Sequence, residues 1–302
     1  MATGDEVLSE PFSASARPTP SAEEVAEKTR RMQEEHTNNQ RPKPGDTPDQ
    51  LGAKLITIAC IYEPWPEHGE IARELIDKGA NIHFRDDGGA TALLKASGAA
   101  NAPLVKLLLE KGADPNTCET RGNDGALGRP ICYAAYRSSA EVVKLLLEAG
   151  ANPDARTTGP DGRTALMLAI DYARQKDKTE PCPDTVIALI EGGASPDLPR
   201  FDGWTALSYS LSNKMPNTAK YLIAHGADPE LPNGDMTPLR RAELICPDAV
   251  ETIKNAIAQR REQERTVKAE RDHLDQWMKD GCPAESAAKP MAKLKLRTKA
   301  AP

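Results

Sequence analysis

The sequence predicts an all-α solenoid in which helix-turn-helix units, joined by β-hairpin-like loops, stack one on the next. Three observations predict this fold class. A Gly-Ala phrase recurs five times, with its glycines 33, 38, 43 and 33 residues apart. A Leu-Leu or Leu-Ile pair precedes each glycine, and a Thr-Ala-Leu-like phrase marks the start of a unit. One such unit buries only part of its apolar surface, so we expect several units to stack and bury a continuous strip.

The first helix of each unit is predicted by the recurring opening phrase. Its first residues are Thr91, Arg129, Thr164, Thr205 and Thr237, each followed by Ala or Pro and then by Leu or Ile. A threonine hydroxyl can accept hydrogen bonds from the first free N–H groups of a helix, and Ala or Pro suits the first turn. An Ala or Ser stands five residues after each opening residue. Such a small side chain allows this short helix to lie close to its neighbours.

The second, longer helix of each unit carries the leucine pair and ends at the glycine. Val105, Val143 and Val186 stand at helical spacing from these pairs and complete an apolar face. Glycine ends a helix well because it enters the left-handed backbone conformation without strain. The Ala-Asp or Ala-Asn step and the proline that commonly follow, as in residues 112–115, then turn the chain into a hairpin.

These phrases resemble the ankyrin repeat family, which has a 33-residue period and a Thr-Pro-Leu-His-like opening. The resemblance covers about residues 52–258, with about six units that we expect to start near residues 52, 87, 125, 160, 201 and 233. The first unit is divergent, with Lys54-Leu55-Ile56 at its opening, and the last lacks the Gly-Ala phrase. Two insertions, near residues 119–127 and 174–183, are either binding loops or neutral variation.

The segments on either side of the repeats differ from them in composition. Residues 1–50 hold six prolines and a net charge of −4, which predicts a disordered N-terminal segment. Residues 259–281 mix six basic with six acidic residues and predict a charged helix that continues from the preceding repeat. This helix either docks on the end of the solenoid or forms a coiled coil. Residues 282–302 carry a net charge of +4, which predicts a basic, disordered tail.

Composition and charge argue against several classes of protein. The net charge of −6 argues against a dedicated nucleic-acid binder, and the aromatic content of 4% argues against a β-sandwich. No apolar run approaches the roughly 18 residues that span a bilayer. The six cysteines contain no Cys-x-x-Cys pair, which favours reduced thiols over disulfides or a zinc site. We therefore expect a cytoplasmic protein, with the nucleus as the other compartment.

The sequence lacks the motifs of common catalytic and phosphate-binding sites. The five histidines show no spacing typical of metal ligands, and the chain has no Gly-x-Ser-x-Gly, Gly-x-Gly-x-x-Gly or P-loop motif. Cys132 lies on a predicted first helix, and we interpret it as a packing residue. We therefore expect no enzyme activity, no catalytic residue, no cofactor and no metal.

The resemblance also implies a binding surface on the concave face of the solenoid. The variable positions of that face fall four, three and one residues before each opening residue and seven and eight residues after it. They hold Tyr62, Tyr136, Arg137, Arg163, Asp171, Tyr172, Phe201, Trp204 and Met236. This set includes five of the twelve aromatic residues, and Tyr, Trp and Arg dominate interface hot spots. In the alternative interpretation, Phe201 and Trp204 pack on the neighbouring hairpin.

We expect a monomer that binds one or more proteins without catalysis, as an adaptor or scaffold. Two alternatives stay open. An inhibitor or regulatory subunit would use a tail or the loop at 174–183 to occlude the active site of an enzyme. A tether would bind a membrane or a nucleic acid through the basic tail, residues 289–299, with a steep dependence on salt.

Overall fold

The structure is a computed structural model that describes residues 27, 30, 31, 35, 37–61, 66–119, 127–175 and 182–279. The chain divides into two compact units, residues 1–41 and residues 42–302. In the first unit, residues 37–40 are helical, and Arg30 and Arg31 each pair with Glu27 at 2.9 Å. All of the repeats belong to the second unit.

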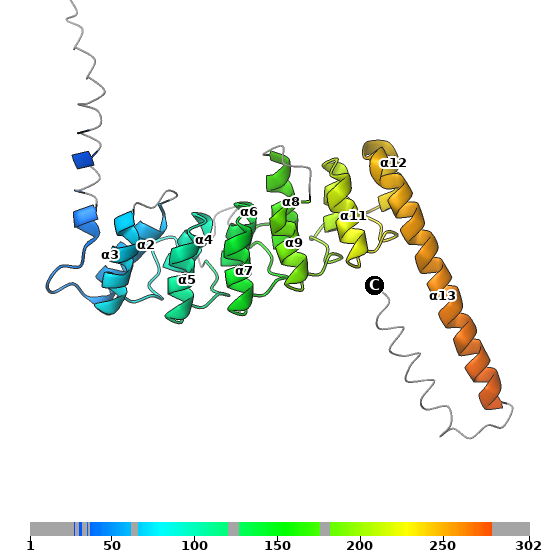
Figure 1. Ribbon diagram of the computed structural model, residues 1–302, viewed down its shortest axis with the longest axis horizontal. Helices are drawn as coiled ribbons and strands as arrows, with labels where there is room; N and C mark the ends of the chain where they lie inside the picture. The colour runs from blue at the N-terminus through cyan, green and yellow to red at the C-terminus, as the bar shows by residue number, and fades with distance from the viewer. Residues whose placement is uncertain are drawn as a thin grey trace, which may run out of the picture. The chain divides into compact units, whose positions relative to one another are not determined.

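The described part of the second unit consists of six consecutive helix pairs (Figure 1). The first helices are α2 (Pro48–Ala59), α4 (Ala92–Gly98), α6 (Pro130–Tyr136), α8 (Ala165–Gln175), α10 (Ala206–Ser212) and α12 (Pro238–Ile245). The second helices are α3 (Pro66–Asp77), α5 (Ala102–Glu110), α7 (Ala140–Glu148), α9 (Asp184–Glu191), α11 (Pro216–Ala224) and α13 (Val250–Lys279). A short 3₁₀ helix, Pro247–Ala249, precedes α13. The described residues contain no strand beyond isolated bridges, so the predicted all-α class is confirmed.

The opening residues cap the first helices, as their sequence predicts. The Oγ1 atoms of Thr91, Thr205 and Thr237 each accept a hydrogen bond from the N–H group three residues later. Thr164 does the same for Met167. Arg129 makes no such bond, and its helix begins instead with Pro130, which lacks an N–H group to satisfy.

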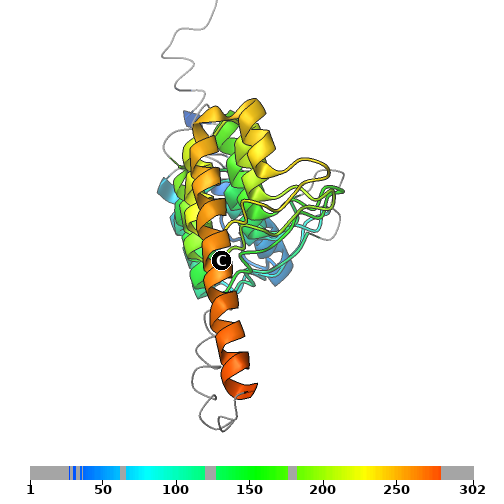
Figure 2. The same ribbon diagram turned by 90° about the vertical axis from the view of Figure 1, so that its right-hand side faces the viewer.

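The helices form two layers. Each first helix packs between the first helices of its neighbours, as α4 does between α2 and α6, and the second helices α3, α5, α7 and α9 contact one another in the same order. Viewed along the stack, the loops that join the pairs project to one side of both layers (Figure 2). We call the surface formed by the first helices and these loops the first-helix face.

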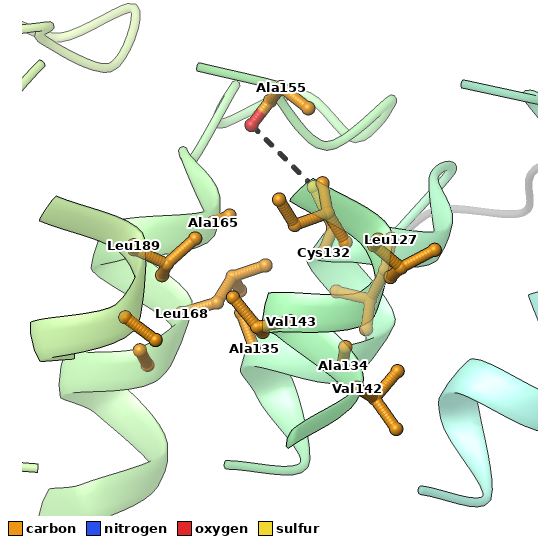
Figure 3. Close-up of a cluster of buried hydrophobic side chains, with 14 of the residues drawn as sticks. Leu127, Cys132, Ala134, Ala135, Val142, Val143, Ala155, Ala165, Leu168 and Leu189 are labelled. Carbon is orange, nitrogen blue, oxygen red and sulfur yellow. Dashed lines mark hydrogen bonds between the residues drawn. The ribbon is translucent and has the colours of Figure 1, made fainter. Parts of the chain in front are cut away.

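The hydrophobic core lies between the layers and continues from pair to pair. In Figure 3, Val143 of α7, Leu168 of α8 and Leu189 of α9 meet beside α6, and all three are fully buried. Cys132 is equally buried, and its thiol donates to the carbonyl oxygen of Ala155 at 3.6 Å. Burial raises the pKa of Cys132 to about 12. This thiol therefore stays protonated at neutral pH, in line with its interpretation as a packing residue.

Two kinds of residue in the left-handed conformation end the helices. The repeated glycines end the second helices as expected, with φ of +87° at Gly79, +90° at Gly112 and +87° at Gly150. Three first helices end instead at non-glycine residues with positive φ: Ala100, Ser138 and Lys214, at 55–56°. Each of these three stands nine residues after its opening residue. The sequence pattern does not predict them, because these side chains do not favour that conformation by themselves.

Asn and Asp side chains shape the turns after the glycines. In the turns that begin at Asn81, Asp114, Asn152 and Asp228, the side-chain oxygen accepts a hydrogen bond from the N–H group two residues on. Neighbouring turns are also linked. The Asn116 side chain accepts from the N–H group of Asn152 at 2.8 Å, and Asp197 accepts from Asp228 at 2.8 Å. The Asn or Asp of the phrase thus shapes each turn, and the side chain four residues after the glycine joins it to the next turn.

The first and last units depart from the expected boundaries. α2 begins at Pro48 and is capped by Thr47, which forms a capping box with Gln50, so the expected opening at Lys54 lies inside the helix. The expected disordered segment therefore does not extend to residue 50. At the other end, α13 runs without interruption past residue 258, the expected end of the repeats, and the charged segment was expected to continue from the preceding repeat. The charged helix is the continuation of the second helix of the last repeat.

Several expectations concern residues outside the described ranges. These are most of the N-terminal segment, most of the insertion at 119–127, the insertion at 174–183 beyond the last turn of α8, and the basic tail at 282–302. Within the described residues, every helix is too short or too polar to cross a membrane.

Candidate protein-binding groove

A groove of about 570 Å³ opens on the first-helix face between the first three repeats and the hairpin of the fourth. Its walls come from the first helices and their hairpins, and none of its lining residues belongs to a second helix. The lining residues are Cys60, Ala90, Leu94, Lys95, Gly98, Ala99, Leu127, Tyr133, Tyr136, Arg137 and Arg163. Three of them are cationic, two are tyrosines and none is acidic.

The first wall of the groove is held by α4 and by the hairpin that precedes it. The Lys95 ammonium lies 3.2 Å from the carboxylate of Asp86. Burial alone would raise the pKa of Asp86, but hydrogen bonds from the N–H group of Ala90 and from Lys95 outweigh it and lower that pKa. Asp86 therefore stays ionised at neutral pH and orients Lys95 in the groove.

The second wall of the groove is α6. The Tyr133 hydroxyl donates to Glu119 at 2.9 Å, and burial followed by this hydrogen bond raises the pKa of Tyr133. Arg137, which follows α6, donates through Nε to the carbonyl oxygen of Gly98 at 3.0 Å. The guanidinium therefore bridges α4 and α6 at the C-terminal end of both helices. Tyr136 meets Tyr172 of α8 edge to face, with ring centroids 6.2 Å apart.

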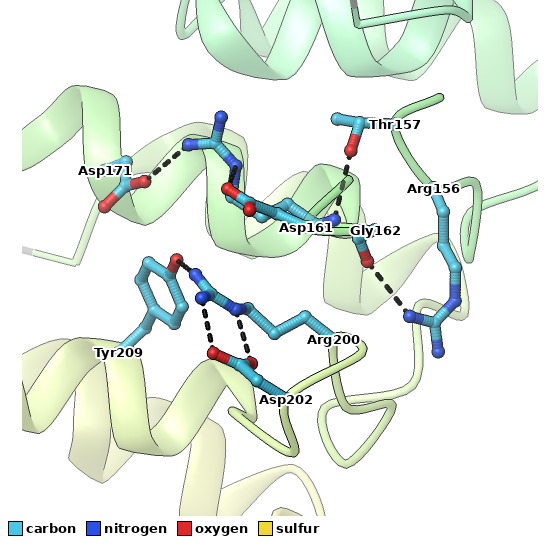
Figure 4. Close-up of polar contacts among 9 residues, drawn as sticks. Arg156, Thr157, Asp161, Gly162, Asp171, Arg200, Asp202 and Tyr209 are labelled. Atoms are coloured by element: carbon cyan, nitrogen blue, oxygen red, sulfur yellow. Dashed lines mark hydrogen bonds and ion pairs between the residues drawn. The ribbon is translucent and has the colours of Figure 1, made fainter. Parts of the chain in front are cut away.

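The third wall begins at the hairpin that precedes α8. Nη1 of Arg163 lies 3.1 Å from Asp171 of α8, and Nε lies 3.8 Å from Asp161 of the same hairpin (Figure 4). The N–H group of Arg163 also donates to the side chain of Thr157. The hairpin is thereby fixed to the helix that follows it.

Phe201 and Trp204 lie beyond the groove, on the next hairpin, in different surroundings. The side chain of Phe201 is 72% exposed, yet its ring lies so close to Gly162 that a Cβ there would come within 2.5 Å of it. Trp204 is half-buried, with its ring edge to face against Tyr209 and the guanidinium of Arg241 4.3 Å from its centroid. Phe201 is therefore exposed and also packed on the neighbouring hairpin, and its role in binding stays a prediction.

The predicted site residues do not form one cluster. Tyr136, Arg137 and Arg163 line the groove, and Asp171 and Tyr172 support it from α8. Met236 is half-buried in a hairpin turn, where its backbone bonds to that of Asn233. Tyr62 lies outside the described residues. The structure thus brings together five of the nine residues.

The sequence prediction did not identify one repeat position whose residues line the groove. The residue four positions after each opening residue lies one helical turn before the predicted position eight residues after it, and so shares its helix face. That position holds Lys95, Tyr133, Tyr209 and Arg241, and in α8 it holds Leu168, which is buried in the core. Lys95 and Tyr133 line the groove itself. The helical spacing was the signal that could have revealed them.

No group of three or more His, Cys, Asp or Glu side chains suited to holding a metal ion occurs in the described residues. The first-helix face instead combines aromatic rings with ion-paired arginines and a lysine. An arrangement of this kind offers contact area and hydrogen bonds to another molecule. Together with the stacked helix pairs, it defines the class of protein as a helical repeat solenoid.

Comparisons with known proteins identify the family. The family model described as ankyrin repeats (3 copies) matches residues 36–119, and the model described as ankyrin repeat matches residues 130–158 and 202–234. The human protein named SH3 and multiple ankyrin repeat domains protein 2 is 36% identical over 81 residues. That match covers 27% of this chain and only 4% of the human protein.

A solved structure agrees with this result. The crystal structure of an ankyrin repeat domain from Acinetobacter baumannii AYE superposes with a TM-score of 0.54 and 25% sequence identity. The superposition covers 67% of this chain and 96% of the Acinetobacter baumannii chain. The chain described here is an ankyrin repeat protein. Ankyrin repeats generally mediate protein–protein interactions and are typically not catalytic.

Proposed function

We propose that this protein is a non-catalytic adaptor or scaffold that binds a protein partner along its first-helix face. The observation that carries the proposal is the groove of about 570 Å³ with two tyrosines and three cations in its lining. Tyrosine and arginine supply large contact areas and directional hydrogen bonds, and they dominate the binding energy of protein interfaces.

The length of the surface supports a protein as the partner. The repeat positions that line the groove have equivalents in the later repeats. There they hold Tyr172, Trp204 and Tyr209, which continue the aromatic surface beyond the cavity. A stable protein interface covers about 800 Å² on each partner, more than a single cavity provides. A surface repeated from one ankyrin unit to the next can provide that area.

Affinity capture from cells of the source organism tests this proposal with two matched double variants. One replaces Lys95 and Arg137 in the groove by alanine. The other replaces Lys106 and Lys144, two exposed lysines on α5 and α7, and removes the same charge from the opposite layer. Circular dichroism would establish that both variants are folded.

We expect the Lys95→Ala, Arg137→Ala variant to bind the captured partner at least about tenfold more weakly, as truncated hot-spot residues do. The Lys106→Ala, Lys144→Ala variant should bind as the wild type does. Equal capture by the groove variant and the wild type would exclude the groove as the binding site.

A further inference from the structure

Arg241 is a buried cation on the first-helix face at the C-terminal end of the array. It lies on α12, four residues after Thr237, at the position that Lys95 and Tyr133 occupy in the groove. Only 7% of its surface is exposed. Arginine is rarely buried to this extent unless an acidic group pairs with it, because removing its charge from water is unfavourable.

The contacts of Arg241 do not neutralise it. Nη1 donates to the hydroxyl of Ser212 at 3.0 Å, and the guanidinium stacks on the ring of Trp204 at 4.3 Å. No ion pair joins Arg241 to an Asp or Glu of the described residues. The pKa of Arg241 is lowered, and burial is the only cause of this shift. Nε is enclosed without a hydrogen-bond partner.

Three half-buried arginines of the array have an acidic partner, whereas Arg129 and Arg156 donate to backbone carbonyl oxygens. Arg163 pairs with Asp171, Arg200 with Asp202 and Arg260 with Asp228. Arg200 also belongs to the same cluster as Arg241, since it donates to the hydroxyl of Tyr209, whose ring packs on Trp204. Arg200 is therefore satisfied within the chain, whereas Arg241 lacks the anion that its burial calls for.

We propose that Arg241, positioned by Trp204 and Ser212, binds the carboxylate of an Asp or Glu in an acidic segment of the protein partner. The inference rests on the proposed function and adds the chemistry of the partner. Because Nη1 is held by Ser212 and Nε is enclosed, a carboxylate can reach Arg241 only through the small exposed part of the residue, where a charge-assisted hydrogen bond would supply the missing anion. The half-buried ring of Trp204 and the ring of Tyr209 supply the apolar surroundings that strengthen such a pair.

The probe is a random peptide library displayed on phage and selected on the full-length chain. We expect the selected peptides to share an Asp or Glu at one fixed position. Arg241→Met should weaken the binding of such a peptide at least about tenfold. Changing the shared acid to Asn or Gln should weaken binding to the wild type equally, and should cause no further loss with Arg241→Met.

Arg240→Met is the matched control, because it removes the same charge from the adjacent residue. Arg240 is exposed and pairs with Glu243 of its own helix at 3.2 Å. This variant should bind the selected peptides as the wild type does. Comparable losses for Arg240→Met and Arg241→Met would show a general effect of charge and would overturn the proposal.

Thermal melting of the free protein distinguishes binding from a structural role. Because a buried charge without an ionic partner does not favour folding, Arg241→Met should melt no more than about 2 °C below the wild type. A much lower melting temperature together with weaker binding would show that Arg241 is structural. Peptides without a shared acid, or unaffected by Arg241→Met, would also overturn the inference. The proposed function would still stand if Lys95→Ala, Arg137→Ala lost its captured partner.

Discussion

At the scale of single residues, two groups of residues at helix ends adopt the left-handed backbone conformation for different reasons. Gly79, Gly112 and Gly150 adopt the left-handed conformation that their place after a leucine pair predicts. For Ala100 and Ser138 the same conformation is imposed by the following helix, which starts one or two residues later. Local preference identifies the first group, whereas only the packing of the folded repeat accounts for the second.

A pair of glycine substitutions should have opposite effects on stability. Gly150 has φ of +87° and no atom near the position of a Cβ, so Gly150→Val is opposed by backbone strain alone. We expect it to lower the free energy of unfolding by more than about 1 kcal/mol. Gly69 lies inside α3 with the same open space, and Gly69→Ala should raise that free energy by about 0.5–1 kcal/mol. Urea denaturation would measure both.

The predicted site residues show what resemblance and periodicity each contribute. The family pattern located Tyr136 and Arg137 in the groove, because their distance from the opening residue is fixed by the first helix. It did not locate Lys95, Tyr133 or Arg241, although one helical turn separates that register from the predicted one. Burial of Arg241 beside Trp204 depends on contact between adjacent repeats, and no pattern within one repeat reveals it.

At the scale of elements, the terminal helices are where the sequence prediction was weakest. α2 is 12 residues long, against seven for α4, because Thr47 and Pro48 supply a capped start before the expected one. Leu51, Leu55 and Ile58 then extend its apolar face. α13 continues for 30 residues, since no glycine or proline interrupts it. Terminal repeats lack one neighbour, so their sequences need not follow the internal pattern.

The first half of α13 should contribute to the stability of the last repeats. Arg260 pairs with Asp228, and Arg261 pairs with Glu230 at 2.7 Å, so the helix is fixed to the preceding hairpin. We expect Arg260→Ala, Arg261→Ala to lower the free energy of unfolding by about 1 kcal/mol, with a smaller effect at high salt. Chemical denaturation at low and high salt would measure this loss.

The control for that variant is Arg265→Ala, Lys268→Ala, which removes the same charge further along α13. Both residues are exposed, and Arg265 pairs with Glu262 of the same helix. This control should change the stability by only a few tenths of a kcal/mol. Equal losses in the two variants would mean that helix charge, and not contact with the hairpin, sets the effect.

At the scale of the whole repeat unit, the packing of the helices is uneven. The first helices contact their neighbours throughout, from α2 to α12. Among the second helices, α3, α5, α7 and α9 are in contact in sequence, as are α11 and α13, but α9 and α11 share little contact. Among the helices, the repeats on either side of this seam are therefore joined by α8 and α10, and their turns are joined by the hydrogen bond between Asp197 and Asp228. The repeating phrases did not predict the seam, since α9 and α11 both carry the Leu-Ile pair before their glycine.

This seam should divide the array into two parts that open independently. Leu222 of α11 and Leu108 of α5 are both fully buried, so replacing either by alanine should lower local stability by about 2–5 kcal/mol. Because stability in repeat arrays passes through contacts between neighbours, Leu222→Ala should speed hydrogen exchange in α10–α13 and leave α4–α7 unchanged. Leu108→Ala should do the reverse. Hydrogen-exchange mass spectrometry under native conditions would measure both, and faster exchange throughout the array in either variant would show one cooperative unit without a seam.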